Sequence, residues 1–506
     1  MSEVTARIAA GYAFEVTALR LGAVVHEGLC DPGAPVRVPL AMLNRHGLIA
    51  GATGTGKTKT LQLLAEQLSE QGVPVFAADI KGDLSGLAAP GESNDKITER
   101  SADVGDHWTP TAYPVEFFAI GGVGAGTPLR ATITSFGPLL LAKVLDLNQT
   151  QEAALALMFH WADAAGLPLL DLADLRAVIG YLTSDEGKPQ LKELGGVSTA
   201  TAGVILRELS VLAHQGAEEF FGEPEFETAD LLRTAPDGRG VISCLELADL
   251  QDRPALFSTF LMWLLADLYQ ELPEVGDIDK PKLVFFFDES HLLFKDASKA
   301  FLDAVLQTVR LVRSKGVGVF FVTQNPTDVP EDVLGQLGNR IQHGLRAFTP
   351  NDADALRKTV RTYPTTEDYE LESVLTSLGI GEAVVTVLSE RGAPTPVAWT
   401  RLPAPRSRMA PVEADVIARA VAESALHPRY AEAVDRESAY ERLTAKVTQA
   451  APQPTSEPVT RERDRTKKPE PSLVSQVLES GAAKSFMRSA ASAIARGLFG
   501  TARRRR

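Results

Sequence analysis

The sequence predicts an α/β fold with a mostly parallel sheet, and three observations support this prediction. Apolar runs of strand length alternate along the chain with segments of helical periodicity. Between about residues 47 and 90 the order is strand, glycine-rich loop, helix, strand, which implies a parallel strand pair. The runs LVFFF at 283–287 and VGVFFV at 317–322 are nearly continuously apolar, as expected of strands covered on both faces.

The composition is that of a soluble globular protein. The 506 residues are 44% hydrophobic and 23% charged, which excludes a wholly disordered, collagen-like or disulfide-scaffold chain. The length allows about two to four domains, or one large α/β domain with insertions. The two cysteines, Cys30 and Cys244, form no CxxC or zinc spacing, and the N-terminus lacks an apolar leader. The run ALFSTFLMWLLA at 255–266 is too short to span a bilayer, so we expect a cytoplasmic protein.

Charge is unevenly distributed along the chain. The net charge is −14, but residues 461–506 hold 12 Lys and Arg against 4 Asp and Glu, a net charge of +8. The first 460 residues therefore carry a net charge of −22. This acidic body argues against nucleic acid coating the outer surface, although it is compatible with a basic pore or groove.

The expected elements follow in chain order. Residues 1–46 read as a short N-terminal β segment, and the core, 47–402, opens with a strand at 46–50, a helix at 58–71 and a strand at 73–78. A further strand is expected at 115–120. Segments within 138–220 have helical spacing and predict a helical insertion, with helices at 139–147, 150–165, 169–182 and 198–214. The α/β pattern then resumes, with strands at 240–247, 283–287, 317–322, 342–347 and 383–388 and helices at 254–271 and 298–313.

The composition changes beyond residue 403. Residues 403–450 read as a linker followed by one or two helices. Residues 451–472 are rich in proline and charge, which predicts a disordered linker. Residues 473–506 place apolar side chains on one helical face and end in RRRR, which predicts a basic amphipathic helix.

The strongest motif is GATGTGKT at 51–58, which matches the P-loop pattern and lies between an expected strand and an expected helix. Its glycines let backbone N–H groups surround phosphate oxygens, and the helix that follows points its positive end at them. Lys57 is expected on the β- and γ-phosphates of ATP, and the Thr58 hydroxyl on Mg²⁺. The residues expected to bind the nucleotide are Gly51, Ala52, Thr53, Gly54, Thr55, Gly56, Lys57, Thr58 and Lys59.

The second motif is FFFDES at 285–290, an apolar strand that ends in two carboxylates. In a parallel sheet such a strand end lies at the edge where ligands bind. Asp288 is expected to hold Mg²⁺ and Glu289 to act as the general base on the attacking water. An acidic strand end that caps the next helix is the structural alternative. Gln324, one helix and one strand later, is expected to bridge the γ-phosphate and the water, although a glutamine before Pro326 could instead cap a turn.

Weaker signals surround these motifs. Four arginines could act on the nucleotide of a neighbouring subunit or form surface ion pairs: Arg310, Arg313, Arg340 and Arg346. His291 follows the carboxylate pair and is equally compatible with a helix start and a coupling role. The stretch DIKGDLSG at 79–86 follows the second strand, and its acid and lysine could face the nucleotide, the next subunit, or only a turn.

Taken together, these motifs resemble the HerA-like branch of the HerA–FtsK P-loop ATPases, and most closely its bacterial YjgR-type members. The resemblance covers roughly residues 10–405, in stretches such as RHGLIAGATGTGKTKTLQ, KPKLVFFFDESHLLF and VRLVRSKGVGVFFVTQNPTDVPEDVLGQLGNRIQHGLRAFTP. It implies a RecA-like core with an additional strand, and a ring-forming ATPase, expected to be a hexamer, that uses ATP and Mg²⁺. It assigns catalytic roles to Lys57, Glu289 and Gln324, and matches Arg313 and Arg340 to trans-acting arginines.

The resemblance leaves the partner open. Archaeal members begin with a β-barrel domain that docks a nuclease, whereas about 46 residues precede the core here, so a nuclease partner is not expected. The first functional hypothesis is a DNA-threading translocase or helicase. The second is an ATPase that acts on a protein or at an anionic membrane surface through its basic C-terminal helix. A nucleotide-gated scaffold is disfavoured, because binding alone would not need Glu289 and Gln324.

Overall fold

The computed structural model describes residues 2–193, 195–250, 253–276, 278–294 and 299–450, and its strands form one twelve-stranded sheet. The expected disordered linker at 451–472 and the expected amphipathic helix at 473–506 lie outside the described residues. In chain order the strands are β1 (Ala18–His26), β2 (Leu29–Pro39), β3 (Gly47–Ala50), β4 (Val75–Asp79), β5 (Val115–Ile120), β6 (Thr127–Leu129), β7 (Ile242–Glu246), β8 (Leu283–Phe287), β9 (Val317–Thr323), β10 (Asn339–His343), β11 (Glu382–Thr386) and β12 (Ala398–Arg401).

The α-helices of the described residues are α1 (Glu3–Ala10), α2 (Lys57–Glu70), α3 (Asp95–Val104), α4 (Ile133–Val144), α5 (Gln149–Ala164), α6 (Leu172–Thr183), α7 (Lys188–Glu193), α8 (Thr199–Leu212), α9 (Glu218–Phe220), α10 (Pro254–Glu271), α11 (His291–Phe294), α12 (Lys299–Val312), α13 (Glu331–Leu334), α14 (Pro350–Val360), α15 (Leu371–Ser377), α16 (Ala414–Glu423), α17 (His427–Tyr430) and α18 (Ala439–Ala450). Within the described residues, no helix is both long and apolar enough to cross a membrane.

The strand order is β2-β1-β12-β11-β10-β3-β9-β8-β4-β7-β5-β6. All neighbours from β10 to β6 pair in parallel, whereas β11, β12, β1 and β2 extend the sheet in antiparallel. Strand β9 lies between β3 and β8. This order confirms the expected RecA-like core, in which an additional strand separates the P-loop strand from the strand that ends in carboxylates.

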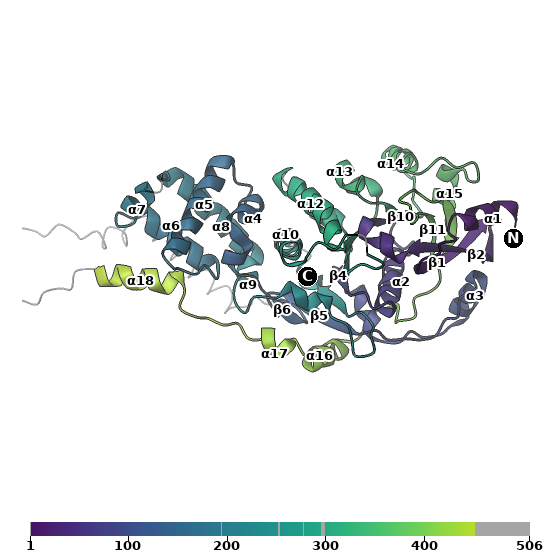
Figure 1. Cartoon of the computed structure of the whole chain (residues 1–506), viewed down its shortest axis with the longest axis horizontal. Helices are drawn as coiled ribbons and strands as arrows, with labels where there is room; N and C mark the ends of the chain where they lie inside the picture. The colour runs from purple at the N-terminus through teal and green to yellow at the C-terminus, as the bar shows by residue number, and fades with distance from the viewer. Residues whose placement is uncertain (1, 194, 251–252, 277, 295–298, 451–506) are drawn as a thin grey trace, which may run out of the picture. The chain divides into compact units, whose positions relative to one another are not determined.

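Alternating side chains on each central strand feed two cores. On β8, Phe285 and Phe287 join the core that also contains Phe260 of α10, whereas Phe286 joins the core that contains Leu61 of α2. Helix α2 therefore covers one face of the sheet, and α10 and α12 cover the other (Figure 1). Strand β8 is buried along its whole length, which explains its uninterrupted apolar sequence.

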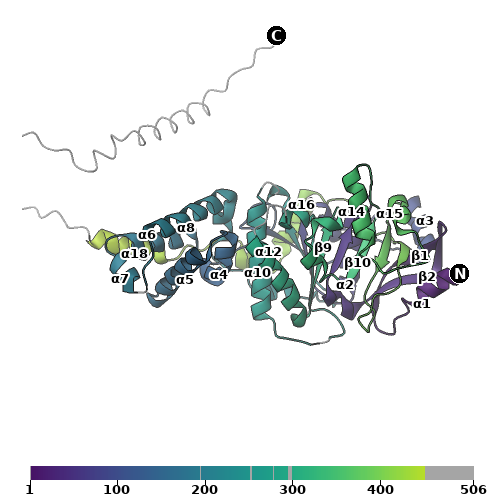
Figure 2. The ribbon, with the colours of Figure 1, turned by 90° about the horizontal axis from the view of Figure 1, so that it is seen from above.

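The helical insertion forms a cluster in which α4, α5, α6 and α8 lie side by side in both views (Figures 1 and 2). Asn148 and Asp171 cap α5 and α6 with reciprocal capping boxes. Within α4, Thr132 caps a first short helix that begins at Ile133, and Gly137, with φ 74° and ψ 162°, interrupts the helical conformation. The helical chain resumes at Pro138, the expected boundary of the insertion. Helix α18 returns to this cluster and packs on α6.

Three parts of the chain differ from the sequence-based expectation. Residues 3–10 form helix α1, capped by Ser2, rather than strand, whereas β1 and β2 are strands as expected and join the main sheet. The strand expected at 342–347 lies at β10, because its pairing register with β3 begins at Asn339 and Gly47. Strands β6 and β12 were not anticipated; both are short, so their sequences carry little periodic signal.

Candidate active site

The P-loop connects β3 to α2 at the carboxyl edge of the parallel strands. Gly54 and Gly56 have φ values of 82° and 116°, a conformation that favours glycine. Gly51 is required for space, because a Cβ atom there would lie 2.5 Å from the Cβ of His343. The loop is fixed from outside: the Ala52 N–H donates to the Gly344 carbonyl at 2.8 Å and the Gly381 N–H donates to the Thr55 carbonyl at 3.0 Å.

Lys57 is buried at the first position of α2, and its Nζ donates to the Ala52 carbonyl at 3.3 Å across the loop. Burial lowers the pKa of Lys57, while the negative charges of Glu289 and Asp288 raise it in part. The ammonium therefore lies between the P-loop and the carboxylates of the next motif. Together with the backbone N–H groups of the loop and the start of α2, it offers positive charge suited to phosphate.

Asp288 follows β8 and is buried. Its Oδ1 accepts a hydrogen bond from the Glu289 N–H at 2.9 Å, whereas its Oδ2 has no hydrogen-bond partner among the described residues. Burial, followed by the neighbouring Glu289 charge, raises the pKa of Asp288 to about 6. A buried carboxylate oxygen without a partner is costly unless a cation satisfies it. The residues present thus fit Mg²⁺, with Asp288 and the Thr58 hydroxyl as the oxygen ligands.

Glu289 stands at the centre of a polar group. Its Oε1 accepts a hydrogen bond from the Lys81 Nζ, and its Oε2 lies 3.4 Å from the Gln324 Nε2 and 3.2 Å from the His291 Nδ1. Burial raises its pKa, but the Lys81 hydrogen bond and charge outweigh this and hold the pKa of Glu289 below its ordinary value. Glu289 also has a φ of 47°, a strained conformation of the kind that concentrates at functional sites.

The structure places Gln324 beside Glu289. It follows β9, between the P-loop strand and the carboxylate strand, and its amide reaches Glu289. Asn325, and not Gln324, caps the short helix at Pro326–Asp328. The Gln324 amide is therefore available to contact the Glu289 carboxylate. His291 begins α11 and also faces Glu289, so both of its sequence-based interpretations are compatible with the structure.

Two residues of the DIKGDLSG stretch, Asp79 and Lys81, have different roles. Asp79 is buried and accepts hydrogen bonds from the N–H groups of Lys81, Gly82 and Leu84, so it shapes the turn. Lys81 instead reaches Glu289, because β4 is the sheet neighbour of β8. The sequence could not reveal this contact, since the adjacency of β4 and β8 depends on strand order. The ligand atoms of Asp79, Cys244 and Glu246 lie within 4.8 Å of one another. The Asp79 carboxylate is occupied by backbone N–H groups and the Cys244 thiol donates to the Glu246 Oε1 at 3.5 Å, so we assign no metal there.

His343 is a site residue that sequence reasoning missed. It ends β10, is fully buried beneath the P-loop, and lies 2.8 Å from the Thr60 Oγ1 through its Nε2 and 2.9 Å from the Glu382 carbonyl through its Nδ1. Burial lowers the pKa of His343 to about 4. A single histidine in a strand carries no sequence signal for this role.

The four candidate arginines differ in their surroundings. Arg340 donates to the carbonyls of Leu337, Thr362 and Leu334 at 3.5, 3.1 and 3.4 Å, so its guanidinium is engaged within its own chain. Arg346 is exposed and lies 3.5 Å from the Thr53 carbonyl of its own P-loop. Arg310 and Arg313 are exposed at the end of α12 and just after it.

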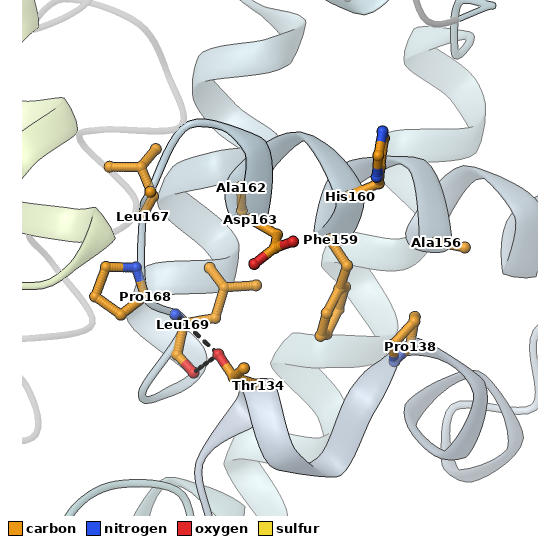
Figure 3. A pocket seen from close by; sticks show the side chains of 11 residues that line it. Thr134, Pro138, Ala156, Phe159, His160, Ala162, Asp163, Leu167, Pro168 and Leu169 are labelled. Atoms are coloured by element: carbon orange, nitrogen blue, oxygen red, sulfur yellow. Dashed lines mark hydrogen bonds between the residues drawn. The ribbon is translucent and has the colours of Figure 1, made fainter.

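A cavity of about 600 Å³ in the helical cluster lies outside this site (Figure 3). Phe159 and Asp163 of α5 face Thr134 and Pro138 of α4 across it, and the Thr134 Oγ1 donates to the Leu169 carbonyl at 2.9 Å. None of its lining residues belongs to the P-loop or to the carboxylate strand.

Comparison with known proteins places this geometry in a family. The family model described as helicase HerA-like C-terminal matches residues 26–506. A DNA double-strand break repair helicase HerA from Pyrococcus furiosus is 22% identical over 384 residues, 68% of this chain. The match covers 63% of that relative, less than two thirds of its length.

Solved structures show the same fold. The conjugative coupling protein TrwB in an unbound form is 15% identical, with a TM-score of 0.50 over 81% of this chain and 95% of that one. TrwB in complex with a non-hydrolysable GTP analogue is 16% identical, with a TM-score of 0.50 over 79% and 99%. The P-loop, the additional strand and the family match across most of the chain lead to one conclusion: the protein belongs to the helicase HerA-like C-terminal family, with a RecA-like P-loop fold.

Proposed function

We propose that the protein hydrolyses ATP with Mg²⁺ and uses the energy to move DNA. The observation that carries the hydrolytic part is the convergence of Lys57, Asp288, Glu289 and Gln324 at the ends of three neighbouring strands. Lys57 and the P-loop bind and orient the phosphates, and Thr58 with Asp288 holds Mg²⁺. The metal ion, when bound, neutralises phosphate charge.

Glu289 acts as the general base in this proposal. Its lowered pKa keeps the carboxylate ionised near neutral pH, as acceptance of a proton from water requires. Gln324 is placed to orient that water, because a neutral amide can both donate and accept a hydrogen bond. Lys81 holds the carboxylate by a hydrogen bond to Oε1, and the His291 Nδ1 lies 3.2 Å from Oε2 without a hydrogen bond.

Two variants test the hydrolytic assignment. Lys57→Ala is expected to lose nucleotide binding, because the P-loop loses its lysine. Glu289→Gln is expected to bind ATP normally but to lose turnover by about 10²–10⁴-fold, because the amide cannot accept the proton. Glu367→Gln, which removes an exposed negative charge elsewhere, is the matched control. Wild-type hydrolysis by Glu289→Gln would remove Glu289 from the role of base.

The DNA-moving part rests on the family and on the curated relative, whose name describes a DNA repair helicase. The test compares ATP hydrolysis by the full chain alone, with single-stranded DNA and with double-stranded DNA. We expect stimulation of several-fold by DNA. An unchanged rate would favour the alternative, an ATPase that acts on a protein or an anionic membrane through the basic residues 461–506. Pelleting with anionic liposomes tests that alternative directly.

We further propose that the protein works as a ring, expected to be a hexamer, in which Arg313 completes the site of the neighbouring subunit. Arg313 is favoured over Arg340 because it is exposed, whereas Arg340 is engaged by three carbonyls of its own chain. A trans-acting arginine contributes about 10³-fold or more to turnover. Mixing inactive Lys57→Ala with inactive Arg313→Ala should restore some activity, because mixed rings contain intact sites. Failure at every mixing ratio would show that Arg313 does not act in trans.

A further inference from the structure

Lys81 reaches the carboxylate strand from the side opposite to the P-loop. In the sheet, β4 borders β8 on one side, whereas β9 and then the P-loop strand β3 lie on the other. Lys81 follows β4 and donates to the Glu289 Oε1, while the Gln324 Nε2, which follows β9, donates to the Oε2 at 3.4 Å. One oxygen of Glu289 is therefore engaged on the side away from the strand that carries the phosphate loop.

This contact keeps Glu289 ionised but opposes its use as a base. A general base accepts a proton from water, and a cation bonded to its carboxylate stabilises the charge that the proton would neutralise. The Glu289 side chain is 5% exposed, whereas the Lys81 side chain is 41% exposed. The carboxylate thus stays in place, while the ammonium has solvent to move into when the ion pair opens.

The loop that carries Lys81 is fixed from outside by residues 405–412, here called the clamp. The Val412 N–H of the clamp donates to the Ser85 Oγ of the loop at 3.2 Å. Gly86 packs so closely on the clamp that a Cβ atom there would lie at 2.5 Å or less from two carbonyl oxygens of the clamp. The position of the loop, and with it that of Lys81, therefore depends on the clamp.

The clamp is also bonded to α2, the helix that begins at the P-loop lysine. The Gln62 Nε2 donates to the Ser407 Oγ at 2.6 Å. The Glu66 carboxylate accepts from the N–H groups of Arg406 and Ser407, both at 2.9 Å. Gln62 and Glu66 are themselves buried, so these bonds join the P-loop helix firmly to the loop that carries Lys81.

We propose that Lys81 is a positioning residue that restrains Glu289, and that the clamp keeps Lys81 in this place. The inference rests on the proposed function and adds a control of its general base. Hydrolysis of ATP is slow while Lys81 is bonded to Glu289, and it becomes faster when the ammonium leaves the carboxylate.

The first test measures kcat and KM for ATP hydrolysis by the full-length protein without DNA. Lys81→Met should raise kcat by about fivefold, which corresponds to about 1 kcal/mol, because the restraint on Glu289 is removed. KM should change by less than about twofold, since the P-loop that binds the phosphates is untouched. Lys81→Arg retains the cation and should stay within about twofold of the wild type.

Gly86→Ala tests the clamp at a distance from the site. It should also raise kcat, and its combination with Lys81→Met should do no more than Lys81→Met alone, because both changes remove the same restraint. Ser85→Ala, which removes the acceptor of the Val412 N–H, is the milder second variant. Gly180→Ala, on α6, is the matched control, because a Cβ atom there meets nothing within 4 Å.

A readout independent of hydrolysis is the rate at which acetic anhydride acetylates Lys81, followed by mass spectrometry without nucleotide. A hydrogen bond to a carboxylate stabilises the charged, unreactive form of an amine. Gly86→Ala and Glu289→Gln should therefore each raise the acetylation rate of Lys81 by about threefold or more. The exposed Lys96 is the internal reference and should not change.

The outcomes separate this inference from the proposed function. An unchanged or lower kcat in Lys81→Met would overturn the restraint, because Lys81 would then support Glu289 or take no part in hydrolysis. Additive effects of Gly86→Ala and Lys81→Met, or unchanged acetylation of Lys81 in Gly86→Ala, would overturn the role of the clamp. Absence of hydrolysis by the wild type and by every variant would overturn the proposed function, and this inference with it.

Discussion

The buried His343 predicts a specific pH dependence of stability. Because a carbonyl oxygen only accepts hydrogen bonds, the 2.9 Å contact with the Glu382 carbonyl places the proton on Nδ1, so Nε2 accepts from the Thr60 hydroxyl at 2.8 Å. The ring is thus neutral in the folded state, and burial lowers its pKa to about 4 from 6.5. Protonation would reverse the bond to Thr60, whose hydroxyl would have to accept from Nε2, and would place a second cation near Lys57.

The size of this loss of stability follows from the difference between the pKa of His343 in the folded and the unfolded state. In the unfolded state His343 binds a proton near pH 6.5, whereas in the folded state it does so only near pH 4. The contribution of the neutral ring to stability is therefore fully present above pH 6.5 and is lost as pH falls toward 4. One pKa unit corresponds to about 1.4 kcal/mol, so the free energy of unfolding falls by about 3 kcal/mol over the whole window, about 2 kcal/mol of it between pH 7 and 5. His343→Asn keeps a donor for the Glu382 carbonyl but cannot titrate.

The assay is urea unfolding of the wild type and His343→Asn at pH 7, 6 and 5. The variant should be less stable at pH 7, and the stability gap should shrink by about 2 kcal/mol at pH 5. Glu66 and Glu246, whose pKa values burial raises to about 7, and Asp288, raised to about 6, contribute in the opposite direction in both proteins and cancel in the difference. His107→Asn, at an exposed position, is the control. A gap that stays constant with pH would refute the reasoning.

Three further perturbations have defined outcomes. Gly51→Ala should destabilise the protein by about 1–3 kcal/mol in thermal denaturation and abolish nucleotide binding, because its Cβ would meet His343; normal binding would show that the loop can shift. Lys81→Met should move the acidic limb of the hydrolysis rate to higher pH, since Lys81 holds the pKa of Glu289 down; an unmoved limb would contradict the ion pair. Deleting 451–506 should leave the ATPase rate largely intact, because the described site draws only on residues before 451; loss of folded protein would show that this segment supports the core.

The parts of the site that lie on short continuous segments could be predicted from the sequence, because residues close together in the chain determine their conformation. The glycine spacing of the P-loop, the run of apolar residues before Asp288 and the position of Gln324 after a strand are short-range patterns, and each lies where it was expected. The observed boundaries of β10 differ from the expected range 342–347, because pairing with β3 determines where this strand begins. The paired residues start at Asn339.

The sequence by itself determined the parallel α/β core and the residues at its P-loop and carboxylate strand, since backbone conformation and burial of a strand depend on neighbours in the chain. Only the tertiary structure decided that β4 borders β8, which brings Lys81 to Glu289, and that His343 lies beneath Gly51. It also decided that the segment after β12 returns to α2, where the Gln62 Nε2 donates to the Arg408 carbonyl. These contacts join residues far apart in the chain, and their formation depends on the order in which strands pack, which no local pattern encodes.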